Sequence, residues 1–288
     1  MPRPSFAHRL SYVYLCLVPI VTFVLAFVTG HISYRIYVPV WILNLIVMFL
    51  ALRVLSAGAF RGEPESRHLA VAGCLLVLPA GILAILFGIG PPPETREEWV
   101  ATTLEQKIRF DALLAAGIIM VLGWSLIKRW LDDRGEKVYS SLGHTALLIA
   151  LPLFLVVTSY WHSFALEAYK VRIQSGTPKS IDWFIAASLQ VWVITICEIA
   201  LTYFAIAMFA SALKKLRVFS RPAAVAYIAI SLVALVAVLG YPLYPGSAPF
   251  SGFPYYPFMI PAVPIMLCYY IGFNLVRLAG RKPNGNPG

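Results

Sequence analysis

Long apolar runs separated by short polar stretches dominate the chain. An α-helix needs about 20 apolar residues to cross the hydrocarbon core of a bilayer, and the runs have this length without the ten-residue alternation of barrel strands. We therefore predict an all-α, polytopic integral membrane protein with eight transmembrane helices in a single domain over residues 1–288. The predicted spans are 11–30, 38–54, 69–90, 110–127, 143–165, 183–212, 222–241 and 257–276.

Composition agrees with this interpretation and excludes other classes of protein. Hydrophobic residues make up 60% of the chain and charged residues 12%, whereas soluble domains carry roughly 45–50% and 25%. The longest polar stretch, 91–109, is too short for a soluble domain. A soluble enzyme and a DNA-binding domain are therefore excluded. The net charge of +10 is explained by basic residues beside the spans, so no nucleic-acid partner is expected.

The distribution of Lys and Arg predicts the orientation. With eight spans, the two termini and the loops on their side carry 16 Lys and Arg residues, and the loops on the other side carry 7. Short loops that are rich in Lys and Arg stay in the cytoplasm. We therefore predict that both termini are cytoplasmic and that the protein lies in the plasma (inner) membrane.

The polar stretch 91–109 contains a helix signal. Thr95 followed by Glu98 is a capping-box pattern, and Val100, Leu104 and Ile108 repeat every four residues. These features predict either an amphipathic helix on the outer surface or a helical lead-in to the fourth span.

Glu198 is the principal candidate for a functional group. It lies near the middle of the run 183–212, where an acid costs roughly 2.5–3.5 kcal/mol on insertion scales. We predict no Lys or Arg at this depth, which favours the neutral carboxyl, and Thr202 is one turn away. The sequence is consistent with a proton carrier, a ligand anchor or an ion site. It is also consistent with a protonated carboxyl that joins two helices.

Other polar residues fall on the predicted outer side of Glu198. Singly, each is typical of an interface or of a hydrogen bond between helices. Together they predict a polar cavity that opens outward and reaches towards the membrane centre. These residues are His31, Asn44, Asp111, Thr158, Ser159, His162, Ser163 and Gln190.

Four histidines provide an alternative constellation. His144 and His162 are 18 residues apart, which places them on one face of a helix, and His68 and His31 match them in depth. The pairs His31/His162 and His68/His144 could ligate two b-type haems. Histidines at membrane interfaces also occur without ligand duties. The four cysteines are dispersed through apolar runs, and no other metal site is predicted.

Three classes of function remain open. The chain has no HExxH, P-loop, GxGxxG or GxSxG motif. The midplane acid favours a small-solute or proton-coupled transporter. The alternatives are a membrane subunit of a redox complex that holds b haem or quinone, and a membrane-embedded enzyme for a lipophilic substrate with Glu198 or Asp111 as general acid. The expected partners are the lipid bilayer and other membrane subunits.

Overall fold

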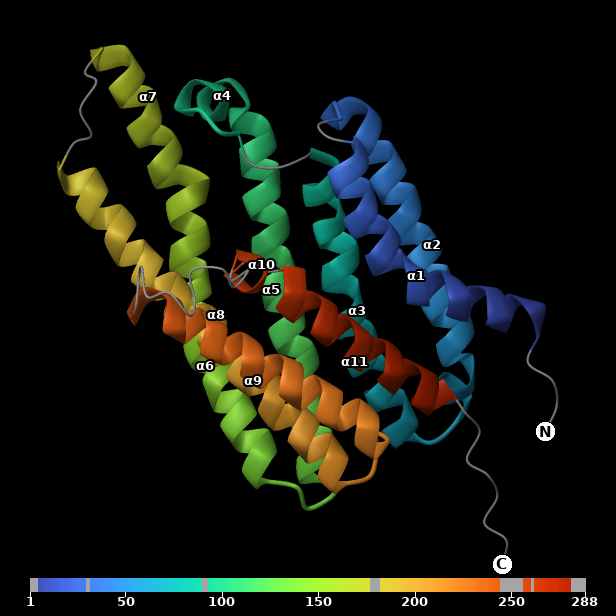
Figure 1. Cartoon of the computed structure of the whole chain (residues 1–288). Coiled ribbons are helices and arrows are strands. Elements are labelled where there is room, and N and C mark those ends of the chain that lie inside the picture. Colours follow the sequence, from blue (N-terminus) through green and yellow to red (C-terminus); the bar gives the residue numbers. More distant parts are fainter. Residues whose placement is uncertain are drawn as a thin grey trace, which may run out of the picture. The chain divides into compact units, whose positions relative to one another are not determined.

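The computed structural model describes residues 5–29, 32–89, 93–176, 182–243, 256–259 and 262–280, and this part of the chain is helical without any strand (Figure 1). The elements are α1 (Phe6–Thr29), α2 (Tyr34–Arg61), α3 (Pro64–Ile89), α4 (Arg96–Ala101), α5 (Thr103–Asp132), α6 (Val138–Ser159), the π-helical turn η1 (Tyr160–Phe164), α7 (Ala165–Ser175), α8 (Asp182–Lys215), α9 (Arg221–Leu243), α10 (Tyr256–Met259) and α11 (Ala262–Gly280).

Within the described residues, seven helices are long and apolar enough to cross a membrane. They coincide with the second to the eighth predicted spans. The first predicted span lies in α1, but the apolar stretch described there, Phe6–Thr22, is shorter than the other seven. The protein is therefore all-helical with a multi-pass, membrane-type architecture. Eight spans and cytoplasmic termini stay predictions.

The capping box before α4 is confirmed. The Glu98 backbone N–H donates to Thr95 Oγ1 at 3.3 Å, and the Thr95 N–H donates to Glu98 Oε2 at 3.5 Å. However, α4 ends at Ala101, and α5 begins at Thr103. Leu104 and Ile108 therefore belong to the long helix α5, so the lead-in interpretation is correct and a separate amphipathic helix over this repeat is wrong.

The chain forms two compact units. The first comprises Met1–Pro92, Ile118–Trp130 and Cys268–Gly288. Its helices α3 and α11 approach closely at two glycines, because a Cβ on Gly272 would lie 2.6 Å from the backbone oxygen of Gly73. Small residues at such crossings allow close van der Waals packing between helices in a membrane.

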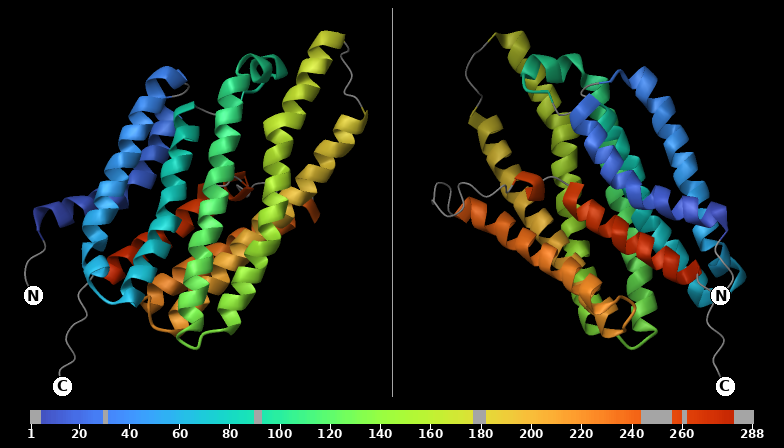
Figure 2. Two further views of the ribbon diagram at one scale, coloured as in Figure 1. Left: turned by 180° about the vertical axis from the view of Figure 1, so that it is seen from behind. Right: turned by 45° about the vertical axis from the view of Figure 1, so that its right-hand side comes forward.

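The second unit comprises Pro93–Gly117 and Leu131–Leu267. Here α6, η1 and α7 form one continuous helix of 38 residues, Val138–Ser175. Figure 2 shows this helix as the green-to-yellow rod, and α8 packs against α6 and α9. A Cβ on Gly143 of α6 would lie 2.9 Å from the Phe209 ring of α8, so the two helices are in close contact there.

Candidate functional site

Glu198 lies at the centre of α8, about 24 Å from either end at 1.5 Å per residue. Its side chain is half-buried, and that of Thr202 is buried. The Thr202 hydroxyl is 3.0 Å from the Glu198 carbonyl oxygen and 3.3 Å from Glu198 Oε1. Among the residues that the structure describes, Thr202 is the single side chain that hydrogen-bonds the Glu198 carboxyl. Because this hydroxyl lies on the same helix, the carboxyl is not tied to a neighbouring helix.

Two contacts give the register of α6 against α8. Tyr160 and Ser188 share a hydrogen bond of 2.6 Å between their hydroxyls, and Gly143 lies beside Phe209. The helices run antiparallel between these contacts, which places Glu198 at the level of residues 150–154. The face of α6 there is made of buried small and apolar side chains, including Ala146, Leu147 and Ala150. This face provides no cation for Glu198.

Two of the predicted outer residues do meet, although they are 51 positions apart in the sequence. Asp111 Oδ1 of α5 lies 3.4 Å from His162 Nε2 of η1. His162 Nδ1 in turn shares a hydrogen bond of 2.6 Å with Ser163 Oγ. The Asp111 side chain is 66% exposed and that of His162 26%, so the pair is open to solvent.

An aromatic cluster holds α4 against α5 and α7. The Trp99 ring lies 6.2 Å from Phe110, 5.8 Å from Trp161 and 6.1 Å from Tyr169, measured between centroids. Leu166, which is fully buried, completes it. We call this part of the second unit the α7 end. Sequence reasoning missed the cluster because its members come from three separate segments.

Asn44 and Gln190 have separate environments. Asn44 lies on α2 in the first unit, where the Tyr14 hydroxyl of α1 donates to Asn44 Oδ1 at 2.8 Å. Gln190 is exposed on α8 in the second unit. The described contacts therefore assign Asn44 to a link between two helices, and the predicted cavity stays a prediction.

The four histidines of the haem alternative lie in different parts of the chain. His31 lies outside them. His68 is exposed in the first unit, and His144 is half-buried in the second. Within the described residues, no three His, Cys, Asp or Glu side chains lie together in an arrangement that could hold a metal ion. The two pairs of haem ligands therefore stay a prediction.

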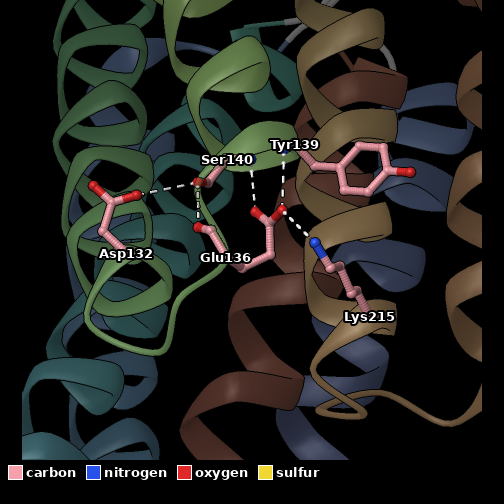
Figure 3. Close-up of polar contacts among 5 residues, drawn as sticks. All are labelled: Asp132, Glu136, Tyr139, Ser140 and Lys215. Atoms are coloured by element: carbon pink, nitrogen blue, oxygen red, sulfur yellow. Dashed lines mark hydrogen bonds and ion pairs between the residues drawn. The ribbon is translucent and has the colours of Figure 1, made fainter.

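At the opposite end of the second unit, Glu136 lies in the α5–α6 turn, and the sequence analysis did not single it out. Its carboxylate is fully buried and accepts the N–H groups of Tyr139 at 3.1 Å and Ser140 at 2.9 Å (Figure 3). Lys215 Nζ of α8 is 3.7 Å away. The Ser140 hydroxyl lies 2.8 Å from the Glu136 carbonyl oxygen and 3.2 Å from Asp132 Oδ1. Glu136 thus caps α6 and joins it to α8.

Comparison with protein-family models, with curated proteins and with solved structures gives no match. The chemistry of the described side chains is therefore the basis for a function.

Proposed function

We propose that the protein is a proton-coupled transporter of a small solute, in which Glu198 takes up and releases the proton. One observation carries this proposal: a carboxyl at the centre of a membrane-type helix has a hydroxyl of its own helix as its described partner. Ionisable groups at this depth are costly and are usually retained for function. An acid that only joined helices would bond to a second helix, as Glu136 does through Lys215.

The proposal includes a topology. Eight helices with both termini in the cytoplasm, in the plasma membrane, follow from the excess of Lys and Arg on one side. The α7 end then faces outward, and the α5–α6 turn faces the cytoplasm. Asp111 and His162 would lie where a solute first meets the protein, and the lipid bilayer would cover the apolar helix faces.

Proton entry into sealed vesicles tests the proposal. The reconstituted protein is exposed in turn to amino acids, sugars, organic acids and inorganic ions, while a trapped pH-sensitive dye reports proton entry. We expect one class of solute to drive proton entry in the wild type and not in Glu198→Gln. Glu97→Gln is the matched control, because Glu97 is an exposed acid on α4 and the same side chain is replaced by the same amide. Equal responses of wild type and Glu198→Gln to every class would refute the proposal.

Chemical labelling provides a second readout that needs no solute. Dicyclohexylcarbodiimide is apolar and reacts with protonated carboxyls inside membranes. Mass spectrometry should find the adduct on Glu198 in the wild type, at much lower yield on exposed Glu97. A chain without an adduct on Glu198 would count against a protonated carboxyl at this position.

The order of groups at the α7 end favours a second candidate, a membrane-embedded hydrolase. Ser163, His162 and Asp111 present a hydroxyl, an imidazole and a carboxylate in contact with one another, which is the order of nucleophile, base and orienting acid in acyl transfer. A fluorophosphonate probe would label Ser163 in such an enzyme, and Ser163→Ala would lose the label. An unlabelled wild type would exclude this candidate.

A further inference from the structure

We propose that, in the conformation described here, protons and water reach Glu198 from the α7 end alone, along a row of side-chain oxygens on α8. This inference rests on the proposed function of Glu198 and adds the side from which that residue is loaded. The row consists of Ser188, Thr195, Glu198 and Thr202. At 100° per residue, the four side chains project within about 80° of one another, so they share one face of α8.

Each member of the row has a described hydrogen bond. Ser188 is joined to Tyr160 of η1 at 2.6 Å, Thr195 Oγ1 donates to the Val191 carbonyl at 2.8 Å, and Thr202 donates to Glu198. Ser188 and Thr195 are about 10 Å apart along the axis. The buried Val191 side chain lies on this face between them and packs against Tyr160. The proposed route therefore requires water to pass Val191 and to carry the proton as hydronium, which transfers it to a Glu198 oxygen and leaves water.

The π-helical turn connects the row with the surface. Within η1, Tyr160 faces α8, where it meets Ser188, and His162 faces α5, where it meets Asp111. Such turns insert an extra residue into a helix and often occur at functional sites. The exposed Asp111–His162 pair and the buried Tyr160 hydroxyl are thus two residues apart on one turn. The solvent-accessible Asp111–His162 pair therefore lies close in sequence to Tyr160, which is bonded to Ser188, the first hydroxyl of the row.

The other half of α8 is closed by packing. Beyond Thr202, the side chains of Tyr203, Ile206, Phe209 and Leu213 are completely buried, and Gly143 of α6 is in close contact with the Phe209 ring.

The polar side chains in this half do not continue the row. The Tyr203 hydroxyl donates to the Phe258 carbonyl of α10 at 3.2 Å. Ser211 is about 180° from Thr202 around the helix. The other titratable groups on the described helices α6 and α9, which pack against α8, are Tyr139 and His144 of α6 and Arg221, Tyr227 and Tyr241 of α9. Tyr139 lies at the α5–α6 turn, where its ring is 5.8 Å from Lys215 Nζ.

Cysteine accessibility tests the inference in the full-length protein. The variants are made in a background in which the four native cysteines are replaced by alanine; these are Cys16, Cys74, Cys197 and Cys268. A membrane-impermeant thiosulfonate is added to either side of sealed vesicles, at equal pH and without solute. Exposed Ser163→Cys marks the α7 side, and exposed Asp133→Cys marks the side of the α5–α6 turn. Size-exclusion profiles select the variants that fold.

We expect Ser188→Cys and Thr195→Cys to react from the side that modifies Ser163→Cys and from no other. Two controls should stay unmodified: Val193→Cys, at the same depth but about 160° from Thr195, and Ser211→Cys, half-buried in the closed half. Reaction of Thr195→Cys from the side of Asp133→Cys, or from neither side, would overturn the inference.

The labelling distinguishes this inference from the proposed function. If Glu198→Gln leaves proton entry unchanged while Thr195→Cys reacts from the α7 side, the transporter proposal fails and the one-sided access stands. If proton entry requires Glu198 but Thr195→Cys reacts from the opposite side, the access inference alone fails. Tyr160→Phe adds a functional readout, because it removes the hydroxyl bonded to Ser188 and should slow proton entry.

Discussion

Glu136 and Glu198 are two acids of the same unit with opposite surroundings. Glu136 is completely buried, and its carboxylate accepts two backbone N–H groups and lies near the Lys215 ammonium. Glu198 is half-buried at the centre of α8 and has the Thr202 hydroxyl beside it. Glu136 therefore interacts with donors of two helices, the backbone N–H groups of α6 and the ammonium of α8. Glu198 has one donor from its own helix.

This difference separates a structural role from a chemical one. The Glu136 carboxylate is held by backbone N–H groups and therefore fixes the start of α6, which is a structural role. A carboxyl with one hydroxyl partner keeps lone pairs open for a proton, an ion or a solute. Four predictions, from the largest expected change in the free energy of unfolding to the smallest, test this distinction.

Glu136→Ala should lower the free energy of unfolding by about 2–4 kcal/mol, because the buried Ser140 N–H and the part-buried Tyr139 N–H lose their acceptor and Lys215 loses its partner. Thermal unfolding in detergent, followed by circular dichroism, measures the change. Asp133→Ala is the matched control, since Asp133 is an exposed acid in the same turn, and it should stay within about 0.5 kcal/mol. A stable Glu136→Ala would remove the structural role.

The turns that follow α5 and α8 each contain one residue with a positive φ, a glycine in one turn and an arginine in the other. Gly135 (φ +80°) follows α5 and Arg217 (φ +57°) follows α8, and both are in the left-handed region. That region costs a non-glycine residue about 1 kcal/mol or more. We expect Gly135→Ala to destabilise by about 1 kcal/mol and Arg217→Gly to stabilise by slightly less. The same sign for both in thermal unfolding would contradict the strain argument.

Lys215→Ala should cost about 0.5 kcal/mol or less, because the Lys215 side chain is 54% exposed and its nitrogen is 3.7 Å from the carboxylate. The test is the same unfolding measurement at low and high salt, where the small difference should shrink. A loss as large as that of Glu136→Ala would mean that the ion pair, and not the backbone N–H groups, holds Glu136.

Glu198→Gln should leave the free energy of unfolding within about 0.5 kcal/mol of the wild type, since no second helix loses a hydrogen bond, and Glu198→Leu should equal or exceed the wild type. Both variants should nevertheless lose solute-driven proton entry. A marked destabilisation by Glu198→Gln would assign this acid to helix joining, which is the alternative that the sequence left open.

Much of the fold could be predicted from the apolar runs and the local motifs of the sequence. The second to the eighth predicted spans could be recognised from local sequence alone, because each is an apolar run of about the length that crosses a bilayer. Thr95 and Glu98 form their capping box because the motif is closed within four residues. Glu198 stands out because one acid interrupts a long apolar run.

Features that depend on tertiary neighbours were beyond the sequence. Glu136 looks like one of several charged loop residues, and only the folding back of α6 and α8 buries it. The Asp111–His162 contact joins two distant helices, so depth alone could not pair them. The row on α8 could not be predicted from the sequence. Ser188 and Thr195 are common residue types, and their role depends on the contact of Ser188 with Tyr160 and on the packing of the other half of α8.

The continuous helix Val138–Ser175 is about 55 Å long, nearly twice the thickness of the hydrocarbon core. A helix of this length exceeds a single crossing of the core, and its α7 part carries Glu167, Lys170 and Arg172. Because Trp99 of α4 packs on Tyr169 of α7 and Tyr160 is hydrogen-bonded to Ser188, a force applied to α7 would be transmitted to α8 through these contacts.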